Sequence, residues 1–584
     1  MKLREIKLTP PIVAISAMLV VMVFANGAFA TDYTWVGGSS MALDDKDNWS
    51  GGIVPGDGDK GTITVSGDEP VTFTVETDTF APWKLVFKPA TGATAPVCVD
   101  LCKHTISMPG TSSARGRLVV QVPSFTVKNG IWKGDQWIVE WGASDRITTF
   151  EFTIEDATFD PPWGNWGWCN VAYAGGVLKL KNAKSNYVPY FQENLTLLCD
   201  NSTFKGMVPH NPAYGTNFFW HVTNHSVITN GTSGGDAQNA HVVIDGESTV
   251  DIDGNLVIGS KNGKAHDNIL AISNATVKVN YITVAGTNDV SYFHNVDFIS
   301  RATWHPMSLN GVSNKVYFTG AKAMSNRRVT NLGRGTLFSV GEGTTLTNGE
   351  IHMENSSGCV SPVAPNAFFW TSGIYSRSSA TDADASSGNV YEIMHGATAL
   401  FAAMENTRGV NGQSNVWRIA GQLLTNNGLD LGMYATSNGN RVELLGDDAR
   451  FLCGRSVGGG TGHLTIGNAT NPDSITVLFK PGPNGFGGEP PLTSEGYSFG
   501  RVTIHKANFE VDLREYHAVL PARKAVYRIP LIKTGIYSSK VAVDDLEELN
   551  AKAKILPDGG RLVVDGRVLY CEFYKKPGLL ILVR

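Results

Sequence analysis

The chain has 584 residues, a formal net charge of −5, 17% charged residues, 64 glycines and seven cysteines. This length exceeds what one compact hydrophobic core usually holds, so a single globular domain is excluded. The small net charge and the lack of a basic block in the sequence argue against a nucleic-acid partner. An odd number of widely spaced cysteines is not the dense framework of a disulfide-stabilised scaffold.

Residues 1–30 have the three-part order of a secretory signal peptide. Lys2, Arg4 and Lys7 precede an apolar run at 12–24, and an Ala-Phe-Ala triplet precedes Thr31. The run is too short to cross a hydrocarbon core of about 30 Å. We therefore expect a cleaved signal and a secreted, cell-surface or periplasmic protein. No other segment is apolar for long enough to cross a bilayer, so we expect no transmembrane segment in the mature protein.

Residues 31–61 are rich in turn-forming residues and are expected to form an N-terminal cap. A stacked β-repeat exposes unpaired strand edges at its ends, and these edges need covering. Trp35 and Trp49 are the expected plug over the first repeat. The same segment holds several carboxylates within a few turns, namely Asp44, Asp45, Asp47, Asp57 and Asp59. Their spacing matches no calcium-binding loop, so solvated turn carboxylates are favoured and no metal site is predicted.

A repeated pattern runs through residues 62–475. FTVKNGIW at 125–132 and FTIEDATF at 152–159 both alternate apolar and polar residues, turn at Asn or Asp, and end on an aromatic residue. The pivot recurs at Asn129, Asp156, Asn182, Asn201, Asn224, Gly246, Asn274, Asn295, Gly320, Gly343, Gly373, Gly396, Gly421, Gly446 and Asn468. The mean interval is about 24 residues. Gly373 and Asn468 fit the pattern least well.

The pivots predict sharp corners between strands. Period-2 alternation marks a strand with one buried face, and Asn and Gly enter the left-handed backbone region at low cost. Each interval holds a strand, a corner and further strands, which predicts an all-β, right-handed parallel β-helix of about 14 coils. A β-propeller is disfavoured because its blades need about 40 residues. We expect the stacked pivots Asn201, Asn224, Asn274 and Asn295 to form a partial ladder of side-chain amides.

Residues 476–584 are expected to form a C-terminal, β-rich cap region. One convincing short helix is predicted at 543–554, with Asp544 and Glu547 spaced as a capping box. A strand pair follows and is predicted to turn at Asp565-Gly566.

The turn-rich start, the Asn/Gly repeats and the terminal KPGLLILVR together resemble exported bacterial proteins with autotransporter-passenger-like β-strand repeats. The resemblance covers nearly the whole mature chain. It implies a β-helix at the cell surface or outside the cell and defines no particular activity.

A search for catalytic motifs favours a protein that is not an enzyme. The residue patches of polygalacturonases, pectate lyases and alginate epimerases do not occur in the sequence in their usual order. The histidines and cysteines lack the spacing of a zinc site. We therefore predict no catalytic residue, no metal and no cofactor, although fold alone does not decide function.

The best functional clue is a group of tryptophans in a Pro/Gly-rich segment. FDPPWGNWGWCN places Trp163, Trp166 and Trp168 where no regular strand is expected. Exposed indole rings are flat surfaces on which sugar rings stack, so these three residues are the candidate binding site. The alternative is a lid that folds back over the neighbouring coil. Four other tryptophans lie in or beside strands and are expected in the core or in surface stacks, namely Trp220, Trp304, Trp370 and Trp417.

Two functions follow from the sequence. The favoured one is a surface or secreted adhesin-like structural protein that binds glycans or other extracellular or cell-surface polysaccharide along its flank by many weak contacts. The alternative is a polysaccharide lyase or glycoside hydrolase with an unrecognised site. Two or three carboxylates beside a Lys or Arg on adjacent coils would favour the enzyme, whereas an aromatic or amide-lined flank would favour binding.

Overall fold

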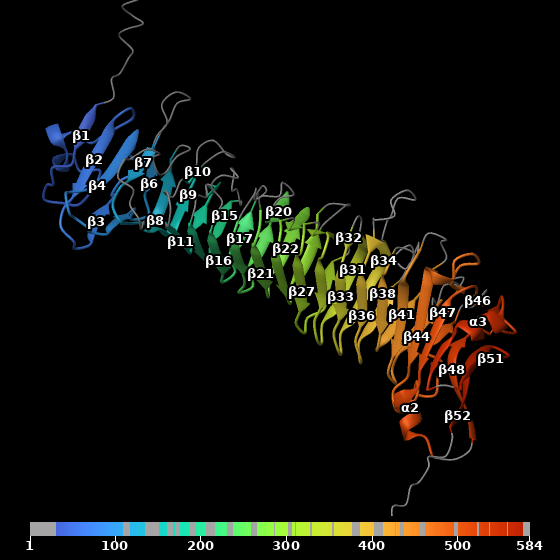
Figure 1. The fold of residues 1–584 in the computed structure, drawn as a ribbon. Helices are drawn as coiled ribbons and strands as arrows, with labels where there is room; N and C mark the ends of the chain where they lie inside the picture. Colours follow the sequence, from blue (N-terminus) through green and yellow to red (C-terminus); the bar gives the residue numbers. More distant parts are fainter. Residues whose placement is uncertain are drawn as a thin grey trace, which may run out of the picture. The chain divides into compact units, whose positions relative to one another are not determined.

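The computed structural model describes residues 31–575, with gaps at 109–116, 135–150, 161–167, 170–175, 187, 190–193, 206–216, 230–237, 259–264, 285, 302–306, 310, 327–329, 353–355, 376–385, 402–412, 427, 433–436, 455–461, 496–499, 522–524, 537 and 558. The expected signal peptide lies outside the described residues. The chain is mostly β-structure with long parallel sheets, consistent with the predicted all-β class and with a parallel β-solenoid (Figure 1). It divides into two units, residues 1–190 with 202–205, and residues 191–201 with 206–584.

Unit 1 contains two runs of parallel strands. The first is β1 (Asp32–Thr34), β2 (Lys60–Val65), β4 (Lys84–Pro89) and β7 (Arg117–Val120). The second is β3 (Val71–Thr74), β5 (Val97–Asp100), β8 (Ser124–Lys133), β9 (Glu151–Phe159) and β11 (Val177–Lys181). Trp49 is buried beside them, and Trp35 packs edge-on against Trp49 and Phe73 at ring-centroid distances of 5.3 and 5.2 Å. The two tryptophans therefore close the apolar interior at this end of unit 1.

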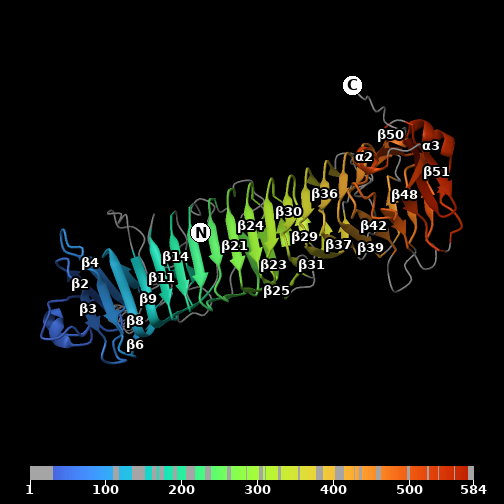
Figure 2. The same cartoon turned by 90° about the horizontal axis from the view of Figure 1, so that it is seen from below.

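Unit 2 contains a long ladder of parallel strands, called the β14–β50 ladder. Its strands are β14 (Thr196–Asp200), β16 (Phe219–Thr223), β18 (His241–Ile244), β21 (Ile269–Ser273), β24 (Val290–His294), β27 (Lys315–Thr319), β30 (Leu337–Val340), β33 (Val360–Val363), β36 (Val390–Ile393), β38 (Val416–Ile419), β41 (Asn440–Leu445), β44 (Ile475–Lys480), β47 (Asn508–Asp512) and β50 (Lys554–Leu556). Figure 2 shows β21, β24, β30 and β36 following one another along this ladder.

A second long sheet of unit 2 is called the β20–β51 sheet. Its strands, in spatial order, are β20 (Asn255–Ile258), β23 (Tyr281–Val284), β26 (Met307–Leu309), β29 (Thr330–Leu332), β31 (Thr345–His352), β34 (Phe368–Tyr375), β37 (Thr398–Phe401), β39 (Gln422–Thr425), β42 (Arg450–Cys453), β45 (Leu492–Ser494), β48 (Ala525–Lys533), β52 (Val568–Lys575) and β51 (Arg561–Asp565), with β28 (Met324–Asn326) beside β31. A four-stranded sheet contains β40 (Leu429–Leu431), β43 (Leu464–Ile466), β46 (Val502–Ile504) and β49 (Ala542–Val543).

The pairing register shows the sequence repeat directly. Ile269 lies opposite Val290, Val290 opposite Lys315, and Lys315 opposite Leu337, so these successive partners are 21 to 25 residues apart. Along a strand such as β36, residues alternate between half-buried and buried. Each inward residue therefore rests on its equivalent one repeat away, as Phe293 does on Phe318 with ring centroids 5.2 Å apart.

Most of the predicted pivots are corners with positive φ, between 45° at Asn201 and 113° at Gly320. Three are not. Gly373 lies inside β34, and the corner of that repeat is Asn366, with φ of 57°. Gly421 does not have a positive φ. Glycine is needed there because a Cβ would collide with the backbone carbonyl oxygens of Met394 and Ala397. At Asn468 the positive φ belongs to the preceding residue, Gly467.

The expected amide ladder at the pivots is present in part. The Asn295 side-chain amide donates to Oδ1 of Asn274 at 3.1 Å, and the Asn224 amide donates to a carboxylate oxygen of Asp200 at 2.7 Å. A second and more extensive ladder was not predicted. It lies at another corner, where a positive-φ residue such as Ser313, Gly388 or Ser414 comes directly before a buried polar residue that opens the next strand.

In this second ladder the buried Asn and Asp side chains each accept the backbone N–H of the equivalent residue one repeat earlier. Asn415 Oδ1 accepts from the Asn389 N–H at 3.0 Å, and Asn440 Oδ1 accepts from the Asn415 N–H at 3.1 Å. Asn268, Asp289 and Asn314 repeat the arrangement at 3.0 Å. These residues are buried, so the ladder satisfies backbone groups that water cannot reach.

Two helices stand at the C-terminal end, and one differs from its predicted capping. α3 (Leu546–Lys552) begins one residue later than the capping-box prediction requires, because Asp545 and not Asp544 accepts the Glu548 N–H, at 2.8 Å. α2 (Arg514–Val519) was not predicted. The predicted strand pair is confirmed, since β51 and β52 pair antiparallel around Gly566. Within the described part of the chain, neither helix nor any other is long and apolar enough to cross a membrane.

The buried ladder makes a testable contribution to stability. Replacing Asn415 by Ala leaves the Asn389 N–H without its side-chain acceptor, and an unsatisfied buried donor costs about 1–3 kcal/mol. We therefore expect Asn415→Ala to lower the free energy of unfolding by that amount in denaturant titrations. The control is Gln422→Ala, which removes an exposed amide from β39. Equal stability of the two variants would contradict a structural role for the ladder.

Candidate functional site

The structure covers only part of the predicted tryptophan site. Trp163 and Trp166 lie outside the described residues. Trp168 opens the two-residue strand β10 (Trp168–Cys169), which pairs in parallel with β13 (Val188–Pro189) of unit 1, so the expectation of no regular strand is wrong at this residue. The three tryptophans therefore remain a predicted site.

The other strand tryptophans separate into two environments. Trp220 and Trp417 are core residues, exposed by 2% or less, as expected. Trp304 lies outside the described residues. Trp370 is half-buried and points outward from β34, because its neighbours Phe369 and Thr371 point into the core. Trp370 is the functional candidate that the sequence analysis left among the structural residues.

Trp370 lines a hollow on the outer face of the β20–β51 sheet. The hollow has a volume of about 480 Å³ and is lined by Thr347, Gly349, Phe368, Trp370 and Ser372. Phe368 is 37% exposed and stands two residues before Trp370 on the same face of β34. Two aromatic rings therefore form one wall, and two hydroxyl groups lie beside it.

The hollow exists because large and small side chains meet across adjacent strands. Trp370 lies opposite Thr347 of β31, and Thr347 lies opposite Ser325 of β28, so the side chains on that flank of the indole are small. On its other flank Trp370 meets Leu400 of β37, which is followed by Leu424 of β39. The indole is thus covered on one side and open on the other.

A buried polar network supports the floor of the hollow. Asn348, fully buried between Thr347 and Gly349, accepts from the Asn326 amide at 2.9 Å and from the Thr330 hydroxyl at 3.1 Å. The Thr371 hydroxyl donates to the Gly349 carbonyl. These bonds fix the backbone beneath the aromatic wall, which keeps the hollow preformed.

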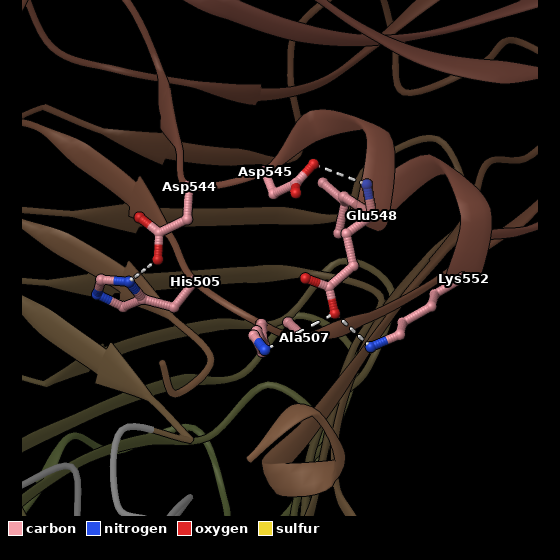
Figure 3. A pocket seen from close by; sticks show the side chains of 8 residues that line it. His505, Ala507, Asp544, Asp545, Glu548 and Lys552 are labelled. Atoms are coloured by element: carbon pink, nitrogen blue, oxygen red, sulfur yellow. Dashed lines mark hydrogen bonds and ion pairs between the residues drawn. The ribbon is translucent and has the colours of Figure 1, made fainter. Parts of the chain in front are cut away.

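A smaller polar cavity of about 260 Å³ is lined by residues 505–507, which follow β46, by Asp544 and Asp545, which follow β49, and by α3 (Figure 3). His505 Nδ1 lies 2.7 Å from Asp544 Oδ2, and Lys552 Nζ lies 2.7 Å from Glu548 Oε1. The Asp545 carboxylate accepts the Glu548 N–H as the cap of α3. All three carboxylates therefore have a partner: two of these contacts stabilise α3 itself, and the third joins His505 to Asp544, which precedes the helix.

A histidine–aspartate pair lies on the outer face of the β40–β49 sheet. His463 Nε2 is 3.4 Å from Asp430 Oδ1, and both side chains are partly exposed. The hydrogen bond with Asp430 raises the pKa of His463. Partial burial favours a higher pKa for Asp430, but hydrogen bonds from His463 and Thr465 outweigh it and lower the pKa. Such a pair has the groups needed for proton transfer.

Carboxylates and guanidinium groups also alternate along the outer face of β36, β38, β41 and β47. Glu443 receives Arg418 at 2.9 Å and Arg441 at 2.7 Å, and Arg441 also reaches Glu510 at 2.6 Å. Burial favours a higher pKa for Glu443, but the two arginines hold it below its ordinary value. Because a general acid needs a raised carboxyl pKa, we interpret this cluster as an ion-pair clamp that links β38, β41 and β47.

The acidic N-terminal turn is organised as turn caps. The Asp45 carboxylate accepts from the Asp47 N–H at 3.0 Å and from the Ser40 hydroxyl at 2.6 Å, and Asp59 accepts from the Gly56 N–H at 3.0 Å. In the part of the chain that the structure describes, no group of three or more His, Cys, Asp or Glu residues is placed to hold a metal ion.

The His463–Asp430 pair predicts a pH window of stability. The raised pKa of His463 adds stability below its unfolded value of about 6.5, which is lost as pH rises through the folded pKa. The lowered pKa of Asp430 adds stability above about 3.9, which is lost as pH falls through the folded pKa. We expect His463→Gln to destabilise the protein most near pH 5.5, by about 1 kcal/mol or less. Thermal melts from pH 3 to 9 measure this, and a pH-independent difference would contradict it.

Comparison with known proteins does not place the chain in a family. No family model matches it, and neither the curated proteins nor the solved structures contain a match.

Proposed function

We propose that this chain is a secreted or surface-exposed structural, adhesin-like protein that binds polysaccharide on its outward sheet faces. The hollow beside Trp370 is the observation that carries the proposal. Aromatic rings offer a large, rigid surface to the apolar face of a sugar, and the Thr347 and Ser372 hydroxyls offer hydrogen bonds to the sugar edge. A single shallow hollow binds weakly, so firm attachment comes from several such contacts along one polymer.

We infer a right-handed parallel β-helix of about 14 coils, capped at both ends, as the scaffold. The parallel registers and the positive-φ corners support this inference. The segments at 31–61, 62–475 and 476–584 are the proposed cap, helix and C-terminal cap region. We propose that the chain is related to exported bacterial proteins that carry autotransporter-associated β-strand repeats. We also propose that residues 1–30 act as the signal peptide for its export.

Cleavage of the bound glycan, by a lyase or hydrolase activity, is the second candidate function. The His463–Asp430 pair favours it, since a raised imidazole pKa keeps a proton donor charged closer to neutral pH. Binding is the better supported of the two, because the carboxylates around the polar cavity and in the ion-pair clamp already have hydrogen-bond or ion-pair partners.

The aromatic hollow makes the first functional prediction. Purified protein is screened on an array of neutral and acidic oligosaccharides, and its affinity for the strongest neutral hit is measured by calorimetry. We expect Trp370→Ala to weaken that affinity at least about tenfold, because the stacking surface is lost. Phe368→Ala should weaken it less, since the indole remains.

The matched control is Leu424→Ala, which removes an outward apolar side chain two strands away from Trp370. It should leave affinity unchanged. The affinity of a variant with Trp163, Trp166 and Trp168 all changed to Ala tests whether the site predicted from the sequence contributes to binding. Absence of binding to every oligosaccharide, or equal binding by the wild type and Trp370→Ala, would contradict the proposed use of the hollow.

Catalysis is tested in the same samples. We expect no release of reducing ends or unsaturated products from a bound polysaccharide over a day at pH 5 to 9. If products are released by the wild type and by the exposed-histidine control His395→Gln, but not by His463→Gln, the protein is an enzyme that uses His463. Chromatography of the digest identifies the products.

A further inference from the structure

A second aromatic surface lies on the outer face of the β14–β50 ladder. Tyr292 of β24 and Tyr317 of β27 lie opposite each other in register, with ring centroids 5.1 Å apart and planes 11° apart. Tyr292 is 46% exposed. The two rings therefore form an outward stack that follows the direction in which the strands succeed one another.

Small residues flank this stack on both sides. Tyr292 lies opposite Ala271 of β21, and Tyr317 lies opposite Ser339 of β30. Neighbouring strands are about 4.8 Å apart, which is also close to the distance between stacked rings. Where the residue on the next strand is small, the face of the tyrosine ring is uncovered. The open space beside it is about as wide as the distance between two strands, which is enough for one further flat ring. The same pairing of large and small side chains produces the hollow beside Trp370.

The charge around the stack is positive. Across the outward positions of β21, β24, β27, β30 and β33, Lys315 is the side chain with a permanent charge, and it stands two residues before Tyr317 on the same face. Among the described residues, no carboxylate lies within ion-pair distance of Lys315. Its exposed ammonium contrasts with Lys322, which pairs with Asp297 at 2.5 Å.

Two histidines on this side of the ladder have polar neighbours of their own. His294, on the same face of β24 as Tyr292, lies 3.1 Å from the Thr319 hydroxyl. His221, three strands away on β16, lies 3.1 Å from an Asp245 carboxylate oxygen. Lys315 therefore supplies the uncompensated charge of this surface.

We propose that the Tyr292–Tyr317 stack and Lys315 form a binding site for an acidic sugar, a uronate residue within an anionic polysaccharide. The pyranose ring stacks on a tyrosine face, the Ser339 hydroxyl bonds to its edge, and the Lys315 ammonium pairs with its carboxylate. The inference rests on the proposed glycan binding and names the sugar class of a second surface.

This surface and the hollow face away from a shared interior. Phe338 of β30 and Phe369 of β34 are both buried and meet with ring centroids 6.1 Å apart, so the two sheets enclose one core. Tyr317 and Trp370 stand on the outer sides of these sheets, so a sugar bound at one leaves the other open.

The test compares two probes of equal length, a hexamer of galacturonic acid and a hexamer of β-1,4-linked glucose, titrated into the purified full-length protein. We expect the acidic hexamer to bind the wild type about tenfold more tightly, because a charge-assisted contact adds to the stacking. Lys315→Met keeps the aliphatic stem and should abolish this preference. Added salt should weaken binding of the acidic hexamer and leave binding of the neutral hexamer unchanged.

Matched variants separate the ring from the charge. Lys322→Met removes a nearby lysine that already has a partner and should leave the preference intact. Tyr317→Phe keeps the ring and should bind normally, whereas Tyr317→Ala should lose about tenfold in affinity for the acidic hexamer. Near-UV circular dichroism of each variant checks that it has folded.

Three results would overturn the inference. One is equal affinity of the wild type and Lys315→Met for the acidic hexamer. Another is loss of that affinity in Trp370→Ala alone, which would place both sugars in the hollow. The third is sugar-independent self-association that disappears in Tyr292→Ala, which would make this face a contact between copies. If neutral sugar binds and depends on Trp370 while the acidic hexamer shows no preference, this inference fails and the proposed function stands.

Discussion

The structure depends on the satisfaction of backbone hydrogen-bonding groups at buried corners. Parallel strands satisfy one another along their lengths, but every repeat must also leave one strand and enter the next, and at those corners the N–H of a residue such as Asn389 bonds to a side chain. Stacked side chains such as Asn389, Asn415 and Asn440 supply the missing acceptors, each to the repeat before it. Corner chemistry thus fixes the alignment of successive repeats, because a shift by one residue would leave a buried donor unpaired.

Once the alignment is fixed, the inward positions have little freedom. A residue such as Phe318 must fit its equivalents Phe293 and Phe338, at 5.2 Å on either side. The outward positions face no such demand, so their sizes vary from strand to strand. A hollow appears wherever a large outward ring stands beside a small residue, as Trp370 does beside Thr347. Surface recognition on this scaffold therefore comes from differences between neighbouring repeats.

This division explains how much the sequence could predict. The pivots with positive φ were predictable, because Asn and Gly with flanking alternation are a local signal that recurs. The second corner was missed because its residues vary among Asn, Asp, Thr, Cys and Ser, and only their shared burial in the structure shows that they are equivalent. At α3 the capping residue was misplaced by one position, since Asp544 and Asp545 are chemically alike and the helix start decided between them.

The candidate site was harder to predict for a related reason. Alternation in Phe368-Phe369-Trp370 shows that the first and third rings share a face, but the residues beside them come from a strand more than twenty positions earlier. Repeats in this chain differ in length, so that partner could not be read from a mean period. A search for clustered tryptophans turned instead to Trp163, Trp166 and Trp168, where neighbours in sequence supply the signal.

Charge separates the surfaces that hold the fold together from those free to bind. Where strands carry both signs, as at Glu443, the carboxylate pairs with Arg418 of the neighbouring strand and with Arg441 of its own strand, and the lowered pKa of Glu443 keeps it ionised. Such a cluster stabilises the stack and offers a ligand little, because an incoming charge must displace an existing partner. Lys315 stands among uncharged residues, and its ammonium is left to bind a group from outside. On this scaffold, the outward side chains that have no charged counterpart in the next repeat are therefore the ones left to carry functional chemistry.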